Sequence, residues 1–104
     1  MIPIKTIEDL IGKHQQLEKE LSSGSIDKKT FAEKSKEYSD LNEVIDIARK
    51  YISYESNKSE LQKILDDKSS DDELKKMAET EMNDLNNENE KNEKKLKLFL
   101  LPKD

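Results

Sequence analysis

Apolar residues between positions 27 and 67 recur at intervals of three, four or seven. This spacing places them on one narrow face of a helix, whereas a strand would alternate them. The stretch contains no Gly and no Pro, so nothing in it obliges a helix to stop. We therefore predict one continuous helix, a rod of about 60 Å at 1.5 Å per residue. Its apolar stripe comprises Phe31, Tyr38, Leu41, Ile45, Ala48 and Ile52.

The chain on either side of this rod predicts two further helices. The first begins at Thr6 as N-cap and ends before Gly24, a residue suited to the position just past a helix C-terminus. The last begins at a capping box formed by Ser70 and Glu73 and is stopped by Pro102. The turns between the helices are short, so neighbours are antiparallel and both flanking helices pack on the rod.

These patterns predict an all-α fold. It is an antiparallel three-helix bundle or coiled-coil-like rod, forming a single helical domain over residues 1–104. The polar run 55–60 interrupts the stripe, and a kink there is open. The oligomeric state is open too, because helices with narrow apolar seams pair between two chains as readily as within one chain.

Composition agrees with thin helical packing. Charged residues make up 41% of the 104 residues, against about 25% in typical domains, and hydrophobic residues make up 32%. Disorder is the competing interpretation of such a composition. The periodic placement of the apolar residues favours order.

Charge and residue usage exclude several classes of protein. The net charge is −5 and Arg49 is the one arginine, so a general nucleic-acid binder is not expected. There is no Cys for a disulfide or a thiolate zinc site. No stretch approaches the ~20 apolar residues of a membrane span, and the N-terminus lacks the features of a signal peptide, so we expect a cytoplasmic protein.

No group of residues has the spacing of a reactive centre. His14 is the one histidine and has no second ligand nearby, so we expect it on a helix surface or at the edge of the seam. The two glycines, Gly12 and Gly24, form no phosphate-binding loop. An acidic cluster could suggest a calcium loop but lacks its Gly and its twelfth-position Glu; it consists of Asp66, Asp67, Asp71, Asp72 and Glu73. We therefore expect no enzyme, and no catalytic, cofactor or metal residues.

Two tyrosines give the best internal indication of a contact surface. Tyr51 and Tyr54 flank Ile52 and cannot both face one seam, so at least one should be exposed, beside Arg49 and Lys50. An ordinary boundary position on an amphipathic helix is the alternative, and it is the one we favour. The residues thus indicate an interaction or positioning module.

The end of the chain, LLPKD at positions 100–104, resembles the point where the N-terminal helical domain of the bacterial-type peptide chain release factor 1 family passes into its next domain. Weaker likeness lies in Phe31 with the run 35–38 and Leu41, and in the runs 65–67, 72–74 and 77–79. The resemblance covers all 104 residues.

This resemblance implies a factor that triggers hydrolysis of peptidyl-tRNA on the ribosome at UAA or UAG. The stop-codon-reading loop and the Gly-Gly-Gln loop of the family are absent from this sequence, so no catalytic residue is carried over. The implied partners are the stalk-base region of the large ribosomal subunit and the methyltransferase that modifies the Gln of the missing loop.

Two other interpretations compete with that of a domain excised from a release factor. One is a free-standing coiled-coil adaptor or chaperone-like protein, and the other is a hydrolase in its own right. A domain cut from a longer chain should leave Leu98, Leu100 and Leu101 partly uncovered, whereas a complete protein should bury them.

Overall fold

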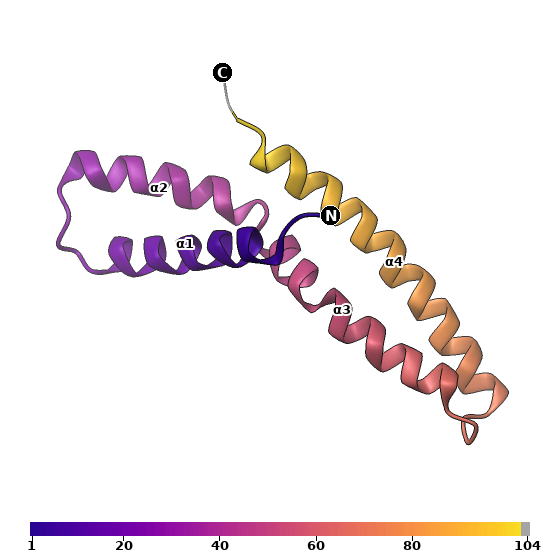
Figure 1. The fold of residues 1–104 in the computed structure, drawn as a ribbon. Coiled ribbons are helices and arrows are strands. Elements are labelled where there is room, and N and C mark those ends of the chain that lie inside the picture. The colour runs from indigo at the N-terminus through magenta and orange to yellow at the C-terminus, as the bar shows by residue number, and fades with distance from the viewer. Residues whose placement is uncertain (103–104) are drawn as a thin grey trace.

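A computed structural model describes residues 1–102 of the chain. It is all-α, as predicted, but holds four helices where we predicted three. They are α1 (Ile4–Ser22), α2 (Lys28–Asn42), α3 (Ile45–Asp66) and α4 (Asp72–Leu100). Figure 1 shows two antiparallel hairpins, α1–α2 and α3–α4, which extend in different directions from a shared junction.

The prediction of one continuous helix over 27–67 is wrong, because the rod breaks at Glu43 and Val44. The Val44 backbone leaves the helical region at φ −121° and ψ −2°, and its N–H donates to the Leu41 carbonyl three residues back. Val44 and Ile45 are both buried. The chain thus places two buried side chains at the point where it passes from α2 to α3. The run 55–60 is unbroken helix.

The break changes how the helices pack. α1 packs on both α2 and α3, whereas α4 packs mainly on α3. The described chain extends 61 × 31 × 19 Å, with a radius of gyration of 18.5 Å. A compact domain of this length would have about 13 Å. The molecule is therefore elongated, with a thin core.

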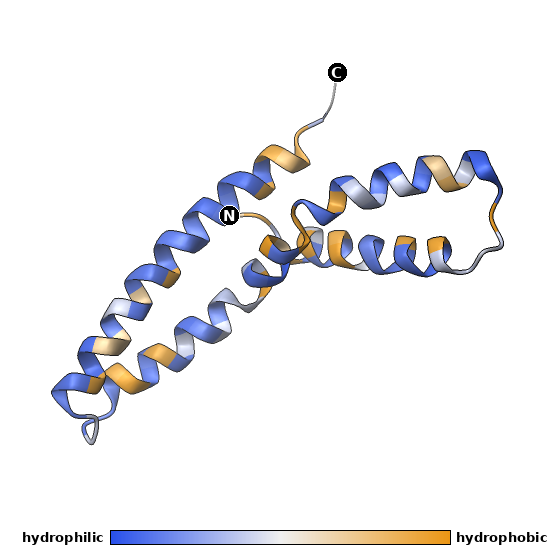
Figure 2. Ribbon diagram, turned by 180° about the vertical axis from the view of Figure 1, so that it is seen from behind, coloured by the Kyte–Doolittle hydropathy of each residue, from blue (hydrophilic) through white to orange (hydrophobic). Residues whose placement is uncertain are grey.

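The core lies at the junction of the two hairpins. It joins the N-terminal segment, α1, the break and α4 around the start of α3, and its buried members are Ile2, Ile7, Val44, Ala48, Tyr51 and Leu96. Figure 2 shows that α4 is mostly hydrophilic, with hydrophobic residues gathered at its C-terminal end. Of the predicted stripe, Leu41, Ile45 and Ala48 are buried, whereas Phe31 is 47% exposed.

Helix termini agree with the sequence only in part. Asp27 caps α2, accepting a hydrogen bond from the Thr30 N–H at 2.8 Å, which is one of the two caps we left open. Gly24 follows α1 with a φ of 71°, as expected of a residue that ends a helix. α1 begins at Ile4 with Pro3 as N-cap, earlier than the predicted Thr6.

The predicted capping box at Ser70 is wrong by one residue. The side chain of Asp71 caps α4, accepting from the Leu74 N–H at 2.8 Å. α4 ends at Leu100, just before Pro102. Lys103 and Asp104, the last part of the LLPKD run, lie outside the described residues.

Candidate docking surface

The prediction that at least one of Tyr51 and Tyr54 is exposed is wrong. Tyr51 is buried, and its hydroxyl accepts a hydrogen bond from the Ile2 N–H at 3.1 Å. Tyr54 is half-buried and donates to Asn86 Oδ1 at 2.7 Å, joining α3 to α4. Arg49 and Lys50 are exposed, but Tyr51 belongs to the junction core and Tyr54 joins α3 to α4.

His14 is buried, contrary to our expectation of a surface or seam-edge position. It is 5% exposed and lies between α1 and α2. Its ring stacks on Tyr38 with centroids 4.7 Å apart, and its Nε2 lies 2.6 Å from Asn42 Oδ1. Because Asn42 ends α2, this hydrogen bond fastens α1 to the residue just before the break. The geometry is that of a structural histidine.

The acidic residues 66–73 lie around the turn between α3 and α4. Asp67 accepts hydrogen bonds from the Ser69 backbone and hydroxyl, which lower the pKa of its carboxyl. Asp71 is the cap of α4. These carboxylates therefore order the turn, and residues 1–102 hold no group of three His, Cys, Asp or Glu side chains able to bind a metal ion.

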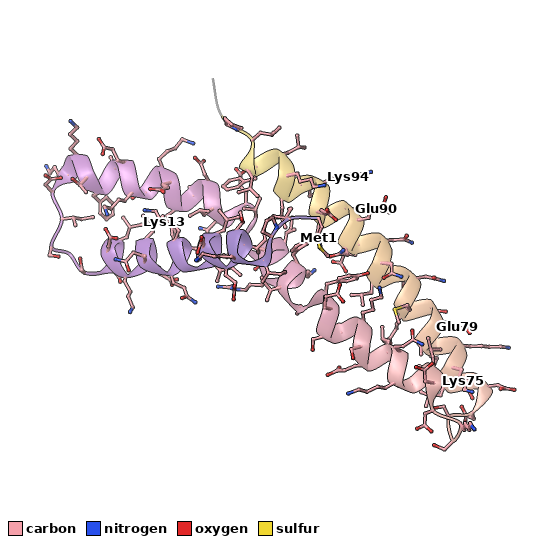
Figure 3. All side chains as sticks on the ribbon, viewed as in Figure 1. Met1, Lys13, Lys75, Glu79, Glu90 and Lys94 are labelled. Carbon is pink, nitrogen blue, oxygen red and sulfur yellow. The ribbon has the colours of Figure 1, made fainter. Side chains whose placement is uncertain are left out.

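The N-terminal segment crosses from α1 to α4, and Figure 3 shows Met1 beside α4. The Met1 ammonium lies 3.0 Å from Glu93 Oε1, and Lys97 lies 3.1 Å from the same oxygen. The hydrogen bond from the Met1 ammonium, followed by that from Lys97, lowers the pKa of Glu93 below its ordinary value of 4.5. The charged carboxylate is thus stabilised in the folded state.

We expect the free energy of unfolding of Glu93→Gln to fall less steeply at acidic pH than that of the wild type. The lowered pKa means that Glu93 contributes fully above pH 4.5, and that this contribution is lost as the pH falls through the lowered value. At pH 7 the substitution should lower the free energy of unfolding by less than about 1 kcal/mol, since the ion pair of Met1 with Glu93 is partly solvated. Urea unfolding at a series of pH values from 7 to 2.5 measures the free energy of unfolding of each variant. Glu90→Gln, an exposed carboxylate on the same helix, is the control; equal acid curves for the two variants would contradict the assignment.

One face of the α3–α4 hairpin is hollowed along its length. Between the middle of α3 and the middle of α4, the hollow is open to solvent and has a volume of about 470 Å³. We call it the acidic groove, and its lining residues are Asn57, Glu60, Leu61 and Ile64 of α3 with Glu81, Asp84, Leu85 and Glu88 of α4. On each helix these are positions i, i+3, i+4 and i+7, which share one face. The regular spacing makes a straight channel between the two helices.

A second hollow of about 160 Å³ continues the acidic groove towards the junction, sharing Asn57, Leu85 and Glu88 with it. Here Lys50 bridges to Glu88 at 3.0 Å, which raises the pKa of the lysine. Asn92 on this stretch is buried. The seam of the second hairpin is therefore partly polar, and its apolar surface opens towards solvent instead of closing.

The end of α4 presents apolar surface as well. Leu98 is 69% and Leu101 60% exposed, whereas Leu100 is half-buried and packs on the core. No helix among residues 1–102 is long and apolar enough to cross a membrane. The end of α4 is thus a second stretch of exposed apolar surface on the described chain.

A family model described as the PCRF domain matches residues 10–104. The chain belongs to the PCRF domain family. The predicted resemblance to release factors is confirmed at this level. No solved structure gives a significant match.

Relatives of this PCRF domain are peptide chain release factors. Peptide chain release factor 1 of Pelagibacter ubique (strain HTCC1062) is 74% identical over 104 residues, which is 100% of this chain and 29% of that protein. Those of Orientia tsutsugamushi (strain Boryong) and Agathobacter rectalis are 38% and 37% identical, each over 94% of this chain and 27% and 28% of their own lengths. The chain thus spans less than a third of the relatives it matches.

The sequence alone did not reveal the acidic groove. The sequence shows its residues at i, i+3, i+4 and i+7 on two separate segments. Whether these two sets face each other depends on where α3 begins and on how α3 and α4 are aligned in the hairpin. The signal that was available is the polar interruption 55–60, which we interpreted as a possible kink. In the structure it includes Asn57 and Glu60, which line the groove.

Proposed function

We propose that this PCRF domain is the accessory N-terminal domain of a peptide chain release factor that terminates translation at UAA and UAG. In this proposal the domain docks and positions the factor and performs no chemistry itself. The observation that carries it is 74% identity to a release factor 1 over the whole length of the chain. The elongated shape and the exposed apolar surface of residues 1–102 support a docking role.

The proposed partners are the ribosome, at the stalk-base region of its large subunit, and the methyltransferase that modifies release factors. Both are proteins or assemblies of the cytoplasm, so the domain would act there. A net charge of −5 supports protein contacts over RNA contacts, because RNA binding needs a basic surface. A free-standing adaptor is not favoured, since the relatives described above are release factors.

A peptide-release assay tests this proposal. Ribosomes programmed with UAA, UAG, UGA or a sense codon are mixed with the full-length factor that contains this domain, or with residues 1–104 alone. We expect the full-length factor to release peptide at UAA and UAG only, and residues 1–104 to release none. Release at UGA would contradict the codon assignment, and release by the 104-residue chain would contradict the docking role.

A second measurement separates docking from chemistry. A factor lacking residues 1–104 should keep its single-turnover release rate at saturating concentration and should bind ribosomes more weakly. A fall in the rate at saturation, with binding unchanged, would assign the domain to the reaction itself.

A further inference from the structure

The acidic groove combines an apolar floor with a rim of negative charge. Leu61, Ile64 and Leu85 are half-buried, so each keeps part of its surface open to solvent. Four carboxylates line the same hollow, and no lysine or arginine does; they are Glu60, Glu81, Asp84 and Glu88. This arrangement costs stability in two ways. The carboxylates repel one another, and the apolar side chains remain in contact with water.

Most of this charge has no partner in the described chain. Glu88 pairs with Lys50, whereas Glu60, Glu81 and Asp84 form no ion pair within residues 1–102. Between α1 and α2, by contrast, Glu20 is paired with Lys34. The three unpaired carboxylates therefore make the groove complementary to cations.

The length of the groove suits a helix of two to four turns. Asn57 and Ile64 are seven residues apart on α3, which is about 10 Å, or two helical turns. The continuation towards Lys50 doubles the length to about 20 Å. An amphipathic helix lays its apolar face into such a channel and its charged flanks against the rim.

We propose that the acidic groove binds a basic amphipathic segment of a partner protein, with apolar side chains on Leu61, Ile64 and Leu85 and with lysines or arginines against Glu60, Glu81 and Asp84. This deepens the proposed docking role and rests on it, because it names the face of the domain and the chemistry of its partner. A nucleic acid is disfavoured, since its phosphates would meet these three carboxylates.

A synthetic peptide of leucine and lysine, about 14 residues long and helical at the i, i+3, i+4 spacing, is the probe. Its affinity for residues 1–104 is measured by fluorescence anisotropy at low and high salt. We compare the double variant E81K/D84K, on the groove rim, with E79K/E90K. Glu79 and Glu90 are exposed on the same helix outside the groove, are labelled in Figure 3, and give the same change of charge.

We expect E81K/D84K to weaken binding at least ~10-fold and E79K/E90K less than ~3-fold, with circular dichroism unchanged in both. Equal losses would overturn the proposal, because net charge alone would then explain binding. So would equal affinity of a peptide with serine in place of leucine, because the floor would then play no part. Tighter binding of an RNA hairpin than of the peptide would overturn it also.

The full-length factor separates this proposal from the proposed function. We expect the peptide to bind it as well, and its E81K/D84K variant to bind ribosomes at least ~10-fold more weakly than its E79K/E90K variant. Peptide binding by residues 1–104 but not by the full-length factor would assign the groove to another segment of the parent chain. If the wild-type factor is active and the two variants bind ribosomes equally, only the proposal for the acidic groove is overturned. If the wild-type factor releases no peptide, the proposed function is overturned.

Discussion

Replacing Leu96 by Ala should lower the free energy of unfolding by about 2 to 5 kcal/mol. Leu96 is fully buried and is the one buried residue that α4 contributes to the junction core. Truncation removes its contacts and leaves a cavity among side chains from three other segments. For a domain of this size, marginally stable by about 5 to 15 kcal/mol, this is a large fraction of the total.

Leu98→Ala is the matched control, because it removes the same atoms two residues along the same helix. Leu98 is 69% exposed, so its truncation should change stability by no more than about 0.5 kcal/mol. Thermal and urea unfolding followed by circular dichroism measure both, with each kcal/mol shifting the midpoint by about 4 to 8 °C. Similar losses for the two variants would mean that α4 is rotated relative to the junction core.

Placing a carboxylate at Ala48 should be the most damaging single change, costing several kcal/mol. Ala48 has no exposed surface and lies in the junction core, so Ala48→Asp would bury a charge without a partner and force a larger side chain into filled space. We expect loss of cooperative unfolding at pH 7 and partial recovery at low pH, where the carboxyl is neutral.

Ile45→Asp tests the break at Val44 by comparison. Ile45 is 6% exposed, yet it is the first residue of α3, where the helix dipole favours negative charge by about 0.3 to 1 kcal/mol. Ile45→Asp also removes a buried Ile side chain, at a cost of about 2 to 5 kcal/mol, so the matched comparison is Ile45→Asn, which removes the same side chain without adding a charge. Asp should be the less harmful of the two if α3 begins at Ile45, and the more harmful if the rod is continuous.

The helical character was predictable because it depends on local information. Gly and Pro are rare, the apolar spacing follows the helical period, and the turns after Ser22 and Asp66 carry capping residues. What the sequence did not determine was the choice between nearby caps. Ser70 and Asp71 are both good N-cap residues, and in the structure Asp71 is the cap.

The break was not predictable by the same reasoning, because no helix-breaking residue stands at positions 43–44. Leu41, Val44, Ile45 and Ala48 keep the i, i+3, i+4, i+7 spacing of one helix face across the break, so the apolar pattern gives no sign of it. The break becomes visible only in the packing, where α1 contacts both α2 and α3. The burial of His14 is of the same kind. Its partners Tyr38 and Asn42 come from α2, and only the antiparallel pairing of α1 with α2 brings them together.

The contacts of the N-terminal segment, residues 1–3, bear on the order of folding. Each hairpin pairs segments adjacent in sequence and can close quickly, because little chain entropy is lost. Ile2 instead reaches Tyr51, 49 residues away, and Met1 reaches Glu93 on the last helix. We expect these long-range contacts to form last, so that a nascent chain leaving the ribosome completes the junction only after α4 has emerged.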